Sequence, residues 1–159
     1  MIEADQFKRV LAHWVTGVTI VTARDRDRVH GMTVSAFTAV SLTPPLVLVC
    51  ADKASNTNPV IAAGGVFAVN ILADDQTALS NTFASKQAEA ERFVGLATDV
   101  GATGAPLITG TVANLDCRVV AAHEHGDHMV YVGEVVEARL TDKEPLLYHS
   151  HSYGTFTAF

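Results

Sequence analysis

The sequence predicts a mainly β protein, a β-barrel with short accessory helices in the connections. Runs of β-branched and apolar residues suit six or more strands, of which Val18–Thr22, Leu46–Ala51 and Val66–Leu72 are the clearest. The helical segments do not alternate regularly with these runs, which disfavours a doubly wound parallel sheet. The chain also lacks a G-x-G-x-x-G after a strand and a G-x-x-x-x-G-K-[ST] loop, so any nucleotide is not held in a Rossmann or P-loop manner.

The first expected element is a helix near the amino terminus. Apolar residues recur there at the spacing of one helical face: Phe7, Val10, Leu11, Trp14 and Val15. Asp5 is the expected N-cap and Gly17 the expected stop. A hairpin should follow, with Val18–Thr22 as its first strand, an alternating charged tip at Arg24–Arg28 and a second extended run over Val29–Leu42.

The middle of the chain should combine buried strands with short helices. Leu46–Ala51 has no polar alternation, which predicts a strand buried on both faces. Asn58 before Pro59 is typical of a helix start, and Gly64-Gly65 of its end. Val66–Leu72 is a further buried strand.

The last part of the chain should hold a helix, a loop and a long hairpin. Asp74 or Asp75 can cap a helix over Gln76–Ala84, and the Gly-, Ala- and Thr-rich stretch Gly95–Gly110 is expected to be loop. The long hairpin pairs Val112–Ala122 with Met129–Leu140 around the polar tip 123–128, and a short aromatic segment over Pro145–Phe159 closes the chain.

Composition narrows the class of protein. The 159 residues suit one domain over 1–159, and 48% apolar residues are ample for a packed core. A net charge of −6 with only 11 Lys and Arg argues against a nucleic-acid partner. Apolar stretches are too short to span a bilayer and the amino terminus lacks a signal-peptide core, so we expect no membrane association. Cys50 and Cys117 sit in apolar runs, which favours free thiols and a cytoplasmic location.

Two polar regions are candidate binding sites on residue type alone. Gly31–Thr38 is small and hydroxyl-rich, so its amides could bond a flat ligand, although composition alone favours an edge strand. Ala51–Pro59 combines Lys53, hydroxyls and the free amides of an expected helix start, which suits an anion as well as it suits a capped loop.

A third region, the histidine-rich tip at 123–128, invites a metal interpretation. A cupin-like site, however, needs a Glu close after the His pair, where Val130 stands, and Glu134 lies too far along. The sequence therefore predicts an exposed tip and no metal site. His128 begins the returning strand, so we expect it to differ from the other two histidines.

Several fragments in order resemble the flavin reductase domain family. They are TGVTIVTA (16–23), HGMTVSAFTAVSLTPPLVLVC (30–50), FAVNIL (67–72), FAS (83–85) and GDH followed by YVGEV (126–135). The chain looks most like the small reductase components of two-component flavin-dependent monooxygenases, such as the 4-hydroxyphenylacetate and phenol hydroxylase reductases. The resemblance implies a split β-barrel, a homodimer and a flavin, FMN or FAD, bound near the dimer interface.

The resemblance also implies roles for particular residues. His128 of the GDH motif would position the nicotinamide of NADH or NADPH, with Tyr148 or Tyr153 as a bordering aromatic. Segment 33–36 would lie along the flavin ring and ribityl chain, and the loop from Ala51 would approach the phosphate. The cofactor contacts implied in this way are Thr33, Val34, Ser35, Ala36, Ala51, Asp52, Lys53, Ser55, Thr57, Asn70, Thr82, Phe83, Ala84, Ser85, Gly126, Asp127 and Tyr148.

The implied activity is NAD(P)H:flavin oxidoreduction, with reduced flavin released to a separate oxygenase. It fits a sequence without a convincing catalytic triad or carboxylate pair, because the cofactors supply the reactive electronics. Alternatives remain: a flavin carrier or sensor without reductase activity, a cupin-like metal domain, and split-barrel relatives of the pyridoxamine-phosphate-oxidase or deazaflavin-dependent kind. The GDH motif favours the reductase, since a carrier needs no nicotinamide site.

Overall fold

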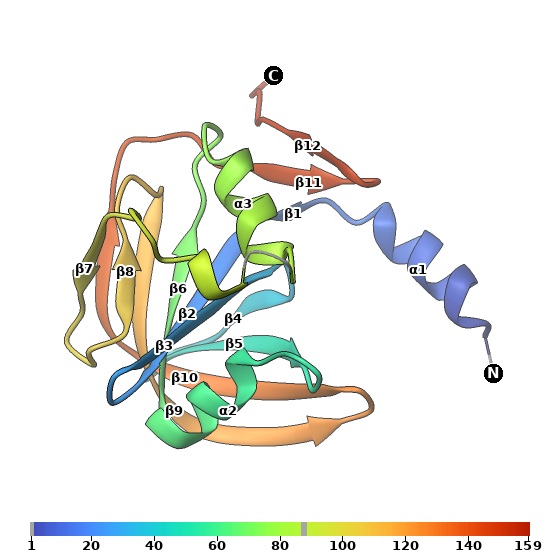
Figure 1. Ribbon diagram of the computed structural model, residues 1–159. Helices are drawn as coiled ribbons and strands as arrows, with labels where there is room; N and C mark the ends of the chain where they lie inside the picture. The colour runs from blue at the N-terminus through green and yellow to red at the C-terminus, as the bar shows by residue number, and fades with distance from the viewer. Residues whose placement is uncertain (1, 87–88) are drawn as a thin grey trace.

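A seven-stranded antiparallel sheet forms the body of the protein in the computed structural model, which describes residues 2–86 and 89–159 (Figure 1). Its strands, in chain order, are β2 (Thr19–Asp25), β3 (Arg28–Val34), β4 (Phe37–Leu42), β5 (Pro45–Asp52), β6 (Val66–Ile71), β9 (Ala113–His125) and β10 (His128–Leu140). They are ordered β3-β2-β6-β9-β10-β5-β4. The edge strands β3 and β4 are joined by Ser35 and Ala36, where the barrel is split. The expected mainly β split barrel is confirmed.

The barrel interior is filled by the inward side chains of β2, β5 and β6. Val21, Val49 and Phe67 are fully buried in one cluster, and burying such side chains is the main stabilising contribution of a core. α2 (Thr57–Gly64) adds Val60 and Ile61 to the same cluster. The helix ends at Gly65, whose left-handed φ of 66° suits glycine.

Several sequence-based boundaries and burial patterns are wrong. The run Val29–Leu42 is two strands that pair with different neighbours, β3 with β2 and β4 with β5. The interval Gly95–Gly110 holds a short hairpin of β7 (Thr98–Val100) and β8 (Pro106–Ile108). α2 begins at Thr57, two residues before Pro59, with Asn56 as its N-cap residue. In β5 only alternate residues are buried, so one face of the Leu46–Ala51 run is open.

The amino-terminal helix α1 (Ala4–Ala12) stands away from the barrel (Figure 1). The expected helix is confirmed, but Glu3 occupies the N-cap position and Asp5 lies in the first turn. Gly17 does not end the helix: it belongs to β1 (Thr16–Gly17). Helix α1 has no buried residue, and the neighbouring Trp14 is 74% exposed. The apolar face predicted by the sequence therefore exists without a covering surface in the single chain.

The carboxyl-terminal hairpin connects α1 to the barrel. β11 (Leu147–His149) pairs with β1 and with β12 (Ser152–Gly154), which gives a three-stranded sheet. The backbone N–H of Ser150 donates to the carbonyl of Ala12 at 2.8 Å. The hairpin thus holds the end of α1 beside the body of the fold.

α3 (Thr77–Ala84) covers the other side of this hairpin, followed by the short 3₁₀ helix η1 (Glu89–Glu91) (Figure 1). The aspartate cap expected for α3 is wrong. Gln76 occupies the N-cap position, and its side-chain oxygen accepts a hydrogen bond from the backbone N–H of Ala73 at 2.9 Å. Within the described ranges 2–86 and 89–159, no helix has the length and apolar character to cross a bilayer.

Candidate functional site

Three cavities share walls along the split in the barrel, and we call them together the trough. The largest, the groove, has a volume of 660 Å³ and is mostly apolar. Its residues come from α1 and the segment after it, from the split and from the open face of β5: Leu11, Trp14, Val15, Thr16, Gly17, Thr19, Ser35, Ala36, Phe37, Thr38, Leu48, Cys50 and Ile71. The open face of β5 that sequence reasoning missed is thus a wall of the groove.

The two smaller cavities continue from the groove. The tyrosine pocket, 280 Å³, lies between β3, α3 and the carboxyl-terminal hairpin, and it shares Ser35 with the groove. The polar pocket, 350 Å³, shares Thr33 and Ala84 with the tyrosine pocket and is lined by Asp52, Ser55, Asn56, Lys86, Glu89 and Arg92 among others. The trough therefore changes from an apolar end to an end rich in charged and hydrogen-bonding groups.

The predicted ring-binding segment 33–36 lies at the centre of the trough. Ser35 and Ala36 are exposed on the groove wall, and the Thr33 hydroxyl donates to the Ser80 carbonyl at 2.7 Å. The side chain of Val34 points into the core and is only 7% exposed. Alternation along β3 explains the difference, because successive side chains point to opposite faces.

The predicted phosphate loop divides between the core and the polar pocket. Asp52 and Ser55 line the pocket, and the Ser55 hydroxyl accepts from the Thr57 backbone N–H at 3.2 Å. Ala51 and Thr57 are buried, and the Thr57 hydroxyl lies 2.7 Å from Nδ1 of His30. Lys53 does not line the trough: its ammonium donates to the Glu124 carboxylate and, at 2.6 Å, to the Gly126 carbonyl.

The Gly126-Asp127-His128 motif forms the two-residue turn and first strand position of the β9–β10 hairpin. Gly126 has a left-handed φ of 58°, which favours glycine there. The turn is held against the phosphate loop, because the Lys53 backbone N–H donates to the Asp127 carbonyl at 2.9 Å and His128 lies opposite Asp52 in the ladder. The sequence-predicted loop and tip are thus brought together by backbone pairing.

His128 has a defined orientation at this tip. Its Nδ1–H donates to the Asp127 carboxylate at 2.7 Å, and this hydrogen bond lowers the pKa of Asp127 below its usual value. With Nδ1 carrying the proton, the neutral ring has its acceptor at Nε2. The hydrogen bond from Lys53 likewise lowers the pKa of Glu124.

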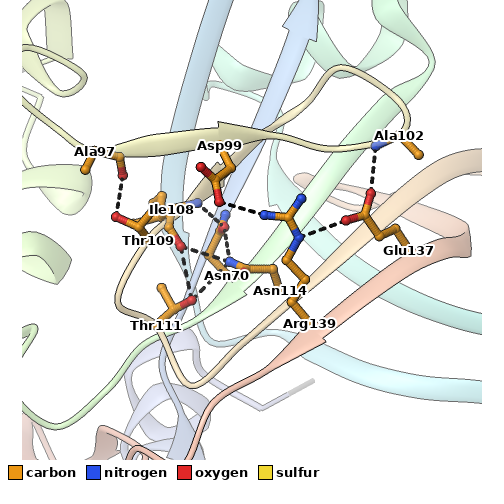
Figure 2. A network of polar contacts seen from close by, with 10 residues as sticks. All are labelled: Asn70, Ala97, Asp99, Ala102, Ile108, Thr109, Thr111, Asn114, Glu137 and Arg139. Atoms are coloured by element: carbon orange, nitrogen blue, oxygen red, sulfur yellow. Dashed lines mark hydrogen bonds and ion pairs between the residues drawn. The ribbon is translucent and has the colours of Figure 1, made fainter.

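Asn70 lies on the outer face of β6, buried beneath the β7–β8 hairpin, and lines none of the three cavities of the trough. Its side chain is fully buried, and its amide donates to the Ile20 carbonyl at 2.9 Å and to the Thr22 hydroxyl at 3.1 Å. Figure 2 shows its oxygen accepting from the Ile108 backbone N–H at 2.8 Å and from the Asn114 amide at 2.9 Å. Every hydrogen-bonding group of this side chain is used to join strands.

The predicted residues of α3 also differ in exposure. Ala84 is exposed in the trough, and Phe83 lies at the base of the polar pocket with 1% exposure. The Thr82 hydroxyl donates back to the Ala78 carbonyl at 3.0 Å. The Ser85 carbonyl accepts from the Arg92 guanidinium at 2.7 Å. Of the four predicted residues 82–85, Phe83 and Ala84 line the trough.

The structure adds residues that the motifs did not single out. The Arg92 guanidinium is 6% exposed and also donates to the Gly31 carbonyl at 2.6 Å, so it joins the end of α3 to β3. A lone arginine after a polar stretch gave no signal of this role. Trp14, two residues beyond the end of α1, lines the groove, and its place on the apolar helical face expected from the sequence was the signal that could have found it.

Tyr148 lies in the tyrosine pocket, with its ring centroid 5.3 Å from that of Tyr153. Among the described residues no three His, Cys, Asp or Glu side chains come close enough to hold a metal ion, including those of the tip. The arrangement suits an elongated organic ligand with a planar, mostly apolar part and a polar or anionic part.

Fold and trough together define a ligand-binding split β-barrel. The chain belongs to the flavin reductase like domain family, whose profile matches residues 11–157.

Individual relatives cover nearly all of the chain. It is 40% identical over 159 residues to a flavin reductase of Pseudomonas putida, covering 99% of this chain and 92% of that protein. It is 37% identical to the reductase component of a 4-nitrophenol 4-monooxygenase/4-nitrocatechol 2-monooxygenase of Rhodococcus opacus, covering 99% and 84%. A solved NADH:FAD oxidoreductase of Streptomyces globisporus, in complex with NAD and FAD fragments, matches with a TM-score of 0.91, 34% identity and coverage of 99% and 96%.

Proposed function

We propose that this protein is an NAD(P)H-dependent flavin reductase that binds FMN or FAD in the trough and supplies reduced flavin to a separate oxygenase. The observation that carries the proposal is the graded trough at the split, apolar at Trp14 and Leu48 and polar at Ser55 and Asn56. Flavins have the same gradient, from a planar ring to a phosphate. Family membership and relatives named as reductase components support the same activity.

The protein groups match what such a ligand needs. The bound flavin supplies the hydride-accepting chemistry, so the chain needs to bind and orient rather than to provide a nucleophile. The apolar walls of the groove offer a surface on which the ring packs. The exposed Ser35 hydroxyl and the backbone at the split offer hydrogen bonds at the ring edge, where negative charge increases on reduction.

The anionic part of the ligand is assigned to the polar pocket. The amino end of α2 opens near it, and Ser55 and Asn56 line it. The cations Lys86 and Arg92 share its wall with the carboxylates of Asp52 and Glu89. Lys53 is held by Glu124 and the Gly126 carbonyl. We therefore propose that Lys53 chiefly connects the loop to the hairpin tip. The phosphate contact is assigned to the residues that line the pocket.

His128 is assigned to the nicotinamide. Its Nδ1 is fixed by Asp127, which leaves Nε2 as an acceptor for the amide of a carboxamide. The side chain is 43% exposed at the tip, beside the loop that borders the polar pocket. In this role the residue orients the hydride donor and does not abstract a proton.

A second copy of this chain is proposed to cover the exposed face of α1. Phe7, Val10 and Trp14 are 52%, 62% and 74% exposed, and contiguous apolar surface of this kind is typical of an interface. Dimerisation would then enclose the groove. Val10→Glu should convert a dimer to a monomer in analytical ultracentrifugation, and an unchanged mass would remove this part of the proposal.

We place this activity on the whole chain, 1–159, and in a reducing, cytoplasmic setting. Both cysteines are free thiols. Burial, together with the neighbouring Asp116 carboxylate, raises the pKa of Cys117 to about 12. A thiol of this kind stays protonated and needs no disulfide partner.

The test is consumption of NADH or NADPH by the purified protein with and without FMN or FAD. Flavin-dependent turnover is expected, and the relative rates identify the preferred flavin and nicotinamide. Asp99→Asn, on β7 away from the trough, is a matched control that should keep full activity. Flavin binding without turnover would instead favour a carrier or sensor.

A further inference from the structure

The tyrosine pocket contains a hydrogen-bonded group to which the proposed function assigns no role. The Tyr153 hydroxyl, from β12, lies 2.9 Å from the Ser80 hydroxyl and 2.9 Å from the side-chain oxygen of Asn81, both on α3. All three residues line the pocket. The carboxyl-terminal hairpin therefore reaches across the pocket and contacts its opposite wall.

The chemistry of the three groups fixes the direction of these hydrogen bonds. A phenol has one proton to donate, and a carboxamide oxygen only accepts. Tyr153 therefore donates to Asn81 and accepts from the Ser80 hydroxyl. Ser80 is fully buried, so its hydroxyl has Tyr153 as a partner in place of water.

This direction determines what Asn81 presents to a ligand. The side-chain oxygen of Asn81 is directed at Tyr153, so its N–H₂ group remains to face the pocket. Among residues 2–86 and 89–159 this N–H₂ group has no hydrogen-bond partner. The Asn81 side chain is exposed, whereas the adjacent Ser80 is held from two sides, because its carbonyl also accepts from Thr33. The amide donor is therefore preoriented.

We propose that Asn81 is a further binding residue of this reductase, whose side-chain N–H recognises a carbonyl oxygen on a planar ring, and that Tyr153 is a positioning residue that acts through Asn81. The inference rests on the proposed function. A ring carbonyl can come from the flavin or from the carboxamide of the nicotinamide. The walls of the pocket suit a flat ring, since Val18 and Ala84 are small or apolar and Tyr148 is aromatic.

The experiment compares Asn81→Ala, Asn81→Asp, Tyr153→Phe and the double variant with the wild type. Ser152→Ala, on the same hairpin and with an exposed side chain, is the matched control. Three quantities are measured: the Kd for FMN by fluorescence titration, the KM for NADH with kcat, and the Tm. Removing one neutral hydrogen bond should weaken binding of the affected ligand about three- to tenfold.

The outcomes separate the two sources of the carbonyl. A weaker FMN Kd in Asn81→Ala and Tyr153→Phe identifies the flavin, and a raised KM for NADH with unchanged FMN affinity identifies the nicotinamide. Asn81→Asp should weaken binding of the affected ligand more than Asn81→Ala does, because it places an acceptor where a donor is needed. In the Asn81→Ala background, Tyr153→Phe should change the affected Kd or KM by less than about twofold further, because its effect passes through Asn81.

Two results would overturn the inference. One is wild-type affinity and KM in both single variants, and the other is full additivity of the two substitutions. Neither result can be confused with failure of the proposed function, in which the wild-type protein itself would bind no flavin and oxidise no NADH. The Tm of each variant shows whether a loss arises from unfolding, and Ser152→Ala should match the wild type throughout.

Discussion

Replacing Asn70 with alanine separates a structural role from a ligand contact. The side chain makes four buried hydrogen bonds between the outer face of the barrel and the β7–β8 hairpin, to Ile20, Thr22, Ile108 and Asn114 (Figure 2 shows the last two). Alanine leaves the buried Ile108 N–H without this acceptor, at a cost of about 1–3 kcal/mol. The vacated volume adds a cavity term, so we expect the free energy of unfolding to fall by about 3 kcal/mol.

For a chain of this size that loss corresponds to a Tm lower by about 6–12 °C. The assay is thermal unfolding at equal protein concentration, followed by FMN titration at a temperature where both proteins are folded. FMN affinity should not change. Thr109→Val is the control, because its exposed hydroxyl also bonds a backbone carbonyl, at 3.1 Å, and should cost less than about 1 kcal/mol. An unchanged Tm with severalfold weaker FMN binding would refute the reasoning and make Asn70 a ligand contact.

Three further predictions concern the tip, the loop and the half-buried His30. His128→Ala should raise the KM for NADH more than it raises the Kd for FMN, and a collapse of FMN affinity at constant KM would contradict the assignment. Lys53→Met should affect FMN and riboflavin equally in titrations, because its ammonium is held by Glu124 and not by the polar pocket; selective loss of FMN would restore a phosphate role. Burial lowers the pKa of His30 below 6.5 despite the nearby Glu89 carboxylate, so the unfolded chain binds the extra proton and the Tm should fall as pH decreases below 6.5. His30→Gln should flatten that slope in melting curves, and an identical slope would exclude His30 as its cause.

The strands were predictable because their residues carry local preference. Val18–Thr22 and Val66–Leu72 are β-branched or apolar, and both are buried strands in the fold. The open face of β5 was not predictable, since Leu48 and Cys50 are apolar and resemble core residues although they line the groove. In a ligand site of this kind, an apolar wall and a core have the same sequence pattern.

The sequence indicates candidate site residues where a short motif carries them and not where distant residues meet. GDH and the segment around Ser35 were singled out from the sequence, and the structure places Ser35 on two cavity walls. The contacts of Arg92 to Gly31 and Ser85, and of Tyr153 to Ser80 and Asn81, were not predicted, although Tyr153 itself was named as a bordering aromatic. Such contacts depend on tertiary packing, which a local pattern does not contain.

With a second copy covering α1, as proposed above, the shape of the groove depends on association. The helix is nine residues long, shorter than helices that persist alone in water, yet Leu11, Trp14 and Val15 at and beyond its end form one side of the groove. Dilution that removes a covering partner should loosen this side and weaken ligand binding together with it. By linkage, a ligand that packs on Trp14 should strengthen association in return. Specific activity would then depend on protein concentration, as in enzymes whose assembly and substrate binding are one equilibrium.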